Sequence, residues 1–162
     1  MAVTTFLEPG TDATQDLSLF STISLAGTGS VASATDQSRT GPRSLKCDIG
    51  TNGSSIAQAR TGAGALVDSG SQISCWLYFD TLPSASTNIV IQGLTSGAAV
   101  VFSVTIGTTG LLNMTPLGAT SVAGTIVLSV NTWYRVSVSY YITNTTTFQF
   151  KLYLNGALEA TA

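Results

Sequence analysis

The sequence predicts an all-β fold, a two-sheet antiparallel β-sandwich of the jelly-roll type, formed as a single domain over residues 1–162. Three observations lead to this prediction. Apolar and polar residues alternate with a period of two in the clearest segments, as they do in a strand with one buried face. Roughly ten such short segments follow one another between turn-forming Gly, Pro, Asn and Asp residues. No long segment has the apolar spacing of a helix, so a sandwich or barrel is the expected architecture.

The first half of the chain gives strand signals of uneven clarity. The segment 17–25 alternates only loosely, whereas 44–49 places Leu45, Cys47 and Ile49 on one side. Residues 27–40 are small and polar, and they are expected to form a long loop. The strands predicted before residue 70 cover residues 3–7, 17–25, 44–49 and 55–59.

The second half is more regular and opens on a clear strand at residues 72–79. Residues 100–102 are apolar without alternation, which predicts a strand covered on both faces. The strands predicted between residues 70 and 130 cover residues 72–79, 88–94, 98–106, 111–115 and 125–129.

The best-defined element is a β-hairpin at the end of the chain. Apolar positions fall on one parity and polar positions on the other, across a polar turn at 143–146. Asn155-Gly156 is a pair that tolerates positive φ and predicts a second turn. The side chains expected in the core are those of Val136, Val138, Phe150 and Leu152.

Residues 157–162 follow this hairpin, and they alternate poorly. We expect either one short strand or an incomplete C-terminal edge. A sheet without its returning strand exposes unpaired backbone groups, which invite pairing with another chain. The sequence therefore predicts self-association, or binding to other subunits, through a sheet edge.

Four motifs in the right order are similar to those of concanavalin A-like lectin/glucanase domains, and the laminin G-like branch is the nearest. They are Gly41-Pro42-Arg43-Ser44-Leu45, the Trp-bearing strand around Trp76, Trp133-Tyr134-Arg135-Val136, and Leu152-Tyr153-Leu154-Asn155-Gly156. The resemblance covers about residues 38–156. It implies the two-sheet jelly roll, but no single activity, because lectins, hydrolases, lyases and structural modules share this fold.

The resemblance also implies calcium as the usual ion of the family, bound by Asp and backbone oxygens. Asp12 and Asp16 are close enough in sequence to share a loop, and Asp36 or Asp48 could join them. Their spacing matches no calcium-loop motif. Ordinary turn-capping aspartates are the simpler interpretation of the same residues, so no cofactor is assigned.

The composition limits the classes of partner. Charged residues make up 9% of the chain and the net charge is −2, which argues against nucleic acid because nucleic acid requires a basic surface. No apolar run reaches the length of a membrane span, so no membrane partner is expected. The N-terminus lacks the basic and apolar regions of a signal peptide.

The two cysteines, Cys47 and Cys75, have two interpretations. One is a disulfide between strands, and the other is a pair of buried free thiols. Cys75 shares its parity with the apolar Ile73 and Leu77, which favours the second interpretation. Two cysteines do not make a recognisable disulfide framework.

Catalysis is not predicted. The chain has no histidine, which removes Ser-His-Asp and Cys-His nucleophile pairs and most zinc or copper sites. Glycoside hydrolysis needs two carboxylates across a cleft, and the glucanases of the resembled family carry a Glu-x-Asp-x-x-Glu strand. The eight acidic residues here are scattered and form no such run.

Aromatic residues on an exposed sheet face can stack on sugar rings, and this gives a candidate carbohydrate-binding set. Trp76 and Tyr78 share one parity of their strand, while Tyr141 shares the parity of Arg135. If both faces are open, these four residues form a platform for a glycan. The alternative for Trp76 is to fill the space between the sheets, and we favour it.

Two functions of different classes follow. The first is a non-catalytic structural or assembly module on a virion surface or another extracellular assembly, because the low charge and hydroxyl-rich strands resemble phage decoration, capsid-associated and fibre proteins. The second is a lectin-like carbohydrate-binding adhesion module, based on the resemblance and the aromatic platform. A polysaccharide-degrading enzyme is a third, disfavoured function.

Overall fold

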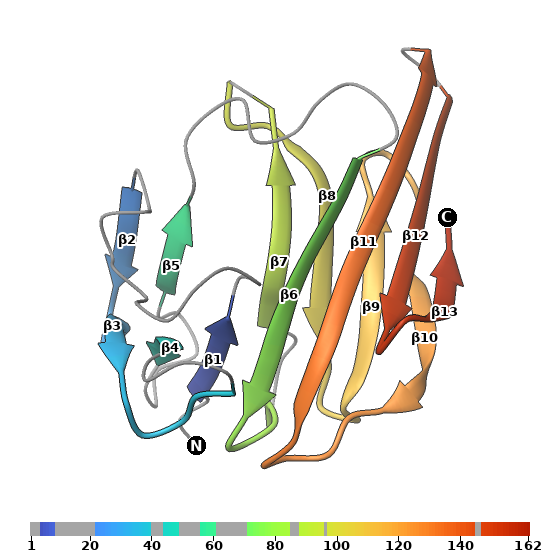
Figure 1. Cartoon of the computed structure of the whole chain (residues 1–162). Helices are drawn as coiled ribbons and strands as arrows, with labels where there is room; N and C mark the ends of the chain where they lie inside the picture. Colours follow the sequence, from blue (N-terminus) through green and yellow to red (C-terminus); the bar gives the residue numbers. More distant parts are fainter. Residues whose placement is uncertain are drawn as a thin grey trace. The chain divides into compact units, whose positions relative to one another are not determined.

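The computed structural model describes residues 4–8, 22–39, 44–48, 56–60, 71–84, 88–95, 97–144 and 147–162. Over these residues the chain is all-β and contains thirteen strands and no helix, as the sequence predicts (Figure 1). The strands pair antiparallel throughout. They belong to two compact units, and β6 and β11 each contribute residues to both.

Unit 1 comprises Met1–Gly62, Cys75–Thr81 and Val130–Tyr134. Its main strands follow the order β6-β1-β4-β3, and β2 pairs separately with β5. Leu45, Leu77 and Phe79 are at most 2% exposed and form its apolar centre. The strands are β1 (Thr4–Glu8), β2 (Thr22–Ala26), β3 (Ser30–Ala34), β4 (Ser44–Asp48), β5 (Ile56–Arg60) and the end of β6 (Ser71–Phe79).

Unit 2 comprises Ala63–Ser74, Leu82–Ser129 and Arg135–Ala162. One sheet has the order β10-β9-β8-β7, and the other strands follow the order β13-β12-β11-β6. Its strands are β7 (Asn88–Leu94), β8 (Val100–Ile106), β9 (Leu111–Pro116), β10 (Val122–Val127), β12 (Thr147–Leu154), β13 (Ala157–Thr161), most of β11 (Trp133–Asn144) and the start of β6.

The core of unit 2 lies between its two sets of strands. The rings of Phe102 on β8 and Phe150 on β12 are 5.5 Å apart between centroids, and both side chains are at most 1% exposed. The buried positions of β8 alternate with partly exposed ones, which gives that sheet one apolar face. The two apolar faces therefore pack on each other as the layers of a sandwich.

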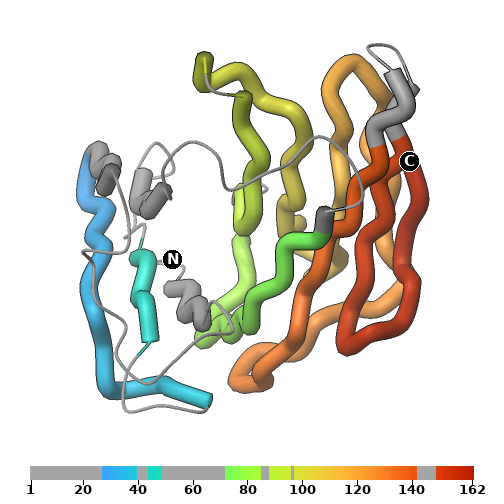
Figure 2. The backbone as a smooth tube through the Cα atoms, turned by 45° about the horizontal axis from the view of Figure 1, so that its top comes forward, coloured from blue at the N-terminus to red at the C-terminus, as the bar shows by residue number. Residues whose placement is uncertain are grey.

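The hairpin prediction is confirmed. Val138 pairs with Leu152 and Tyr140 with Phe150, and the predicted core residues Val136, Val138, Phe150 and Leu152 are all at most 1% exposed. Figure 2 shows β11, β12 and β13 running back and forth beside one another. β11 extends to Asn144, so two residues of the predicted turn at 143–146 belong to the strand, and residues 145–146 lie outside the described part of the chain.

The residues after the hairpin form a strand, β13, which pairs with β12. Asn155 and Gly156 connect the two strands with φ values of 51° and 89°, which suit the expected two-residue turn. The pairing changes register between Leu152 and Tyr153, so β13 contains a bulge. This bulge explains the poor alternation of residues 157–162, because it re-aims the side chains that follow it.

Three predictions need correction. The expected loop at 27–40 contains β3, whose small residues pair with β4. Residues 100–102 are not covered on both faces, because Val100 is 39% exposed at the end of β8 beside a turn. The strand expected at 125–129 lies earlier, at Val122–Val127. Parts of the predicted segments 3–7, 17–25, 44–49 and 55–59 lie outside the described residues.

Candidate functional site

In unit 2, β11, β12 and the start of β6 have two different sides. The inward side is apolar, and the outward side is polar. Cross-strand pairs build it, namely Ser137 with Tyr153, Ser139 with Lys151, and Tyr141 with Gln149. We call this surface the polar face. It consists of Gln72, Ser74, Arg135, Ser137, Ser139, Tyr141, Gln149, Lys151 and Tyr153.

Two adjoining shallow depressions hollow the polar face. Their volumes are about 370 Å³ and about 240 Å³, and Gln72, Ser139 and Tyr153 line both of them. Arg135 lies at one side, whereas Tyr141 and Lys151 line the second depression. Such open, polar hollows suit an extended hydroxyl-rich ligand better than a small apolar one.

Arg135 is held in place by its neighbours. Its Nε donates a hydrogen bond to Ser74 Oγ at 3.0 Å, and Ser137 Oγ donates to the same oxygen at 2.9 Å. Its backbone N–H donates to Asn155 Oδ1 at 2.9 Å. The guanidinium has five donors, so one bond to Ser74 orients the group and leaves further donors for a ligand.

The predicted carbohydrate-binding residues fall into two sets. Arg135 and Tyr141 both belong to the polar face, and Tyr141 is 53% exposed. Trp76 and Tyr78 belong to unit 1. The polar face also contains Gln149, Lys151 and Tyr153, which are not among the predicted residues although they share one parity of the hairpin.

Tyr78 does not form an open platform. Its side chain is 6% exposed, its ring lies 5.3 Å from that of Trp133, and its hydroxyl donates to Asn131 Oδ1 at 3.0 Å. The parity argument fails here because Trp133, at the start of β11, packs against that side. The buried ring therefore has no face to offer a sugar.

Trp76 is half-buried, and the guanidinium of Arg39 lies 3.6 Å from the centre of its ring. A cation in this position is attracted by the ring quadrupole. Stacking of a sugar on that ring face would first require Arg39 to move.

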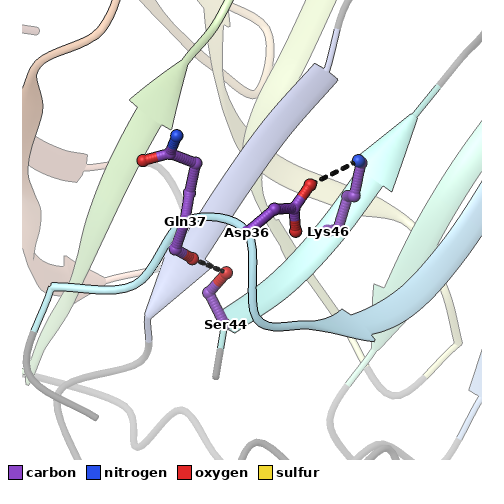
Figure 3. Close-up of polar contacts among 4 residues, drawn as sticks. All are labelled: Asp36, Gln37, Ser44 and Lys46. Atoms are coloured by element: carbon purple, nitrogen blue, oxygen red, sulfur yellow. Dashed lines mark hydrogen bonds and ion pairs between the residues drawn. The ribbon is translucent and has the colours of Figure 1, made fainter. Parts of the chain in front are cut away.

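The candidate calcium ligands Asp12 and Asp16 lie outside the described residues. Asp36 forms an ion pair with Lys46 across the connection of β3 and β4, with 2.8 Å between Oδ2 and Nζ (Figure 3). The hydrogen bond from Lys46 holds the pKa of Asp36 below its ordinary value. Within the described part of the chain, no three His, Cys, Asp or Glu residues are grouped as metal ligands would be.

Both cysteines are free thiols, so the disulfide interpretation is wrong. Burial raises the pKa of Cys47 to about 11 and that of Cys75 to about 12. Because the thiolate is the reactive form, thiols with such pKa values are poor nucleophiles at neutral pH.

A second surface lies where β10 and β13 contact each other, each at the end of its strand order. Three large apolar side chains of these two strands are exposed, namely Ile126 (45%), Val127 (57%) and Leu158 (54%). We call these three residues the apolar strip. Large apolar side chains that stay exposed on two neighbouring strands make these strands a candidate interaction surface.

Glu159 joins β13 to β10 beside the apolar strip. Its Oε2 accepts hydrogen bonds from Thr125 N at 2.9 Å, Thr125 Oγ1 at 2.9 Å and Ile126 N at 3.1 Å. Burial raises the pKa of Glu159, but these three hydrogen bonds outweigh that effect and the pKa lies below its ordinary value.

Comparison of the chain with family models, with curated proteins and with solved structures finds no match. The concanavalin A-like resemblance therefore stays a prediction from the quoted motifs. Across the described residues, no helix is long and apolar enough to cross a membrane.

Proposed function

We propose that the chain is a non-catalytic assembly module of an extracellular or virion surface, and that a second copy of the same chain packs against its apolar strip. The observation that carries this proposal is the exposure of Ile126, Val127 and Leu158 on two neighbouring outer strands. Water is released when such side chains pack against a partner, and this release favours association.

The charge of the chain supports a second copy as the occupant. The net charge is −2 over 162 residues, so two copies repel each other little. Strips on two copies can meet across a two-fold axis, where the same residues face each other. An apolar strip is complementary to itself in this arrangement.

The non-catalytic part of the proposal is supported by the depressions of the polar face. Their described lining contains hydroxyl, amide and cationic groups but no carboxylate pair. An acid and a base placed across a cleft are needed for glycoside hydrolysis. We expect no turnover of common β-glucans, alginate or glycosaminoglycans.

Sedimentation velocity at micromolar concentration tests the assembly proposal. The wild type should sediment as a dimer or larger species, and Val127→Lys should shift it to monomer. Ile89→Lys is the matched control, because Ile89 is 59% exposed on β7 at the opposite end of the same sheet. A monomeric wild type, or equal effects of the two variants, would refute a self-complementary strip. If a different protein were found to bind the strip, that protein and not a second copy would be the partner.

Carbohydrate binding is the second candidate function, and the polar face favours it. Tyrosine rings offer stacking surfaces, and serine and glutamine side chains can hydrogen-bond sugar hydroxyls. A glycan-array screen tests this function with Tyr141→Ala, and Trp76→Ala serves as the control in unit 1. A specific hit that is lost in the first variant and kept in the second supports the polar face. Hits unaffected by Tyr141→Ala oppose it.

A further inference from the structure

The polar face collects positive charge in a chain that is acidic as a whole. The sequence contains six Lys and Arg residues, and the two that belong to unit 2, Arg135 and Lys151, both line this face. Unit 2 has two acidic residues. Glu159 binds β10 instead, and Asp68 lies outside the described residues. The described lining therefore carries two cations and no carboxylate.

The two cations are separated along the strands. Lys151 pairs with Ser139, and Arg135 lies four residues before Ser139 on β11. Four residues of a strand span roughly 13 Å. Tyr153 lies in the row between them, because it pairs with Ser137. This spacing suits a chain-like ligand with repeated acidic groups better than a single small anion.

The chemistry of the two cations suits oxyanions. The bond from Arg135 Nε to Ser74 fixes the plane of the guanidinium, and a planar guanidinium can hold a carboxylate or sulfate with two parallel hydrogen bonds. Lys151 adds a point charge near Tyr141 and Gln149, which line the same depression.

We infer that the polar face binds an acidic glycan, an oligosaccharide that carries carboxylate or sulfate groups along its chain. Arg135 and Lys151 hold acidic groups, Tyr153 and Tyr141 pack against sugar rings, and Gln72 and Ser139 bind hydroxyls. This inference rests on the carbohydrate-binding candidate function. Nucleic acid is the weaker choice because the sequence pI is about 4.7 and two cations make a small basic footprint.

Isothermal titration calorimetry with four probes tests the inference. The probes are a sulfated heparin hexasaccharide, an oligogalacturonate, a neutral cello-oligosaccharide and an oligothymidylate. At least one acidic glycan should bind more tightly than the neutral one, and added salt should weaken it. Arg135→Gln and Lys151→Gln should each weaken it about tenfold, since one charge-assisted hydrogen bond is worth about that factor.

Lys46→Gln is the matched control, because Lys46 is a cation of unit 1 and should leave binding unchanged. Circular dichroism melting confirms that each variant is folded. Neutral and acidic glycans that bind equally, with no loss in the two variants, would overturn the acidic preference and leave carbohydrate binding in place. Absence of binding to every glycan would overturn both. Equal affinity for the oligothymidylate would show a general polyanion site instead.

Discussion

The β11–β12 hairpin and the β10–β13 edge both belong to unit 2, but they differ in the regularity of their strand pairing. From Val136 to Ile142 the hairpin pairs residue by residue without a shift. At the edge, β10 loses register with β9 between Ala123 and Val127, and β13 loses register with β12. A regular ladder satisfies its own backbone groups, whereas a shifted one leaves donors that need another acceptor.

Glu159 supplies that acceptor at the edge. The N–H groups of Thr125 and Ile126 lie in the stretch of β10 where pairing with β9 is interrupted, and both donate to its carboxylate. Gly124 leaves room at this contact, because a Cβ there would lie 3.2 Å from the backbone oxygen of Leu112, which is tight, and 3.4 Å from Glu159 Oε2. The hairpin is therefore stabilised mainly by apolar burial, whereas the edge also depends on the hydrogen bonds that one carboxylate accepts.

The largest effect is expected in the regular ladder. Val138→Asp places a charge at a position that is 0% exposed, and it should cost several kcal/mol and unfold unit 2. Thermal melting by circular dichroism measures this. Ser139→Asp, one residue away and half-buried on the polar face, should keep most of the stability. A soluble Val138→Asp protein with an unchanged melting temperature would mean that the strand faces are reversed.

An intermediate effect is expected at a third irregular position, Gly93 on β7, where the register with β8 shifts. A Cβ at this position would lie 2.3 Å from Cε1 of Phe102, in the centre of the core. Gly93→Ala should therefore cost about 1–3 kcal/mol through overpacking. Urea unfolding compares it with Gly97→Ala, where the nearest atom to a Cβ is Thr95 Oγ1 at 3.8 Å. Equal midpoints for the two variants would contradict the close packing.

A smaller effect is expected at the edge itself. Glu159→Gln keeps the shape of the side chain and removes its charge, and it should cost about 1 kcal/mol at pH 7 because hydrogen bonds to a charged group are stronger. The pKa of Glu159 is lowered from its ordinary value of 4.5. Its charge therefore stabilises the fold above about pH 4.5, and this contribution is lost as the pH falls through the lower, folded-state pKa.

Urea midpoints of the wild type and of Glu159→Gln should therefore differ at pH 7 and converge in acid. A difference that stays constant down to pH 3 would contradict the role of the charge. The ion pair of Asp36 and Lys46 provides a comparison, because its two side chains are 52% and 32% exposed. Lys46→Ala should change stability by less than about 1 kcal/mol, as is usual for exposed pairs.

This contrast explains how much of the fold was predictable. The period of two identified the hairpin and its core because alternation survives wherever the ladder is regular. The same rule missed β3, whose residues Ser30–Ala34 are too small to show a pattern, and it gave β13 little support because of its bulge. Side-chain contacts across a shifted register leave no signature in the spacing of residues.

The candidate site was predicted in part for the same reason. Arg135 and Tyr141 share a parity within one regular strand, and the polar face contains both. The register of the hairpin brings Lys151 and Tyr153 beside them. That register depends on the length of the turn, which the alternation of residues does not give. Tyr78 was misplaced because a residue distant in sequence, Trp133, covers its ring.

The two natural thiols, one buried and one half-buried, have a practical consequence for measurement. With pKa values of about 11 and about 12, Cys47 and Cys75 present roughly one thiolate in ten thousand or fewer at pH 7. An exposed cysteine of ordinary pKa presents a few per cent. A fluorophore or spin label therefore reacts selectively with a cysteine introduced on the surface, for example by Ser129→Cys. Cys47 and Cys75 do not have to be replaced first.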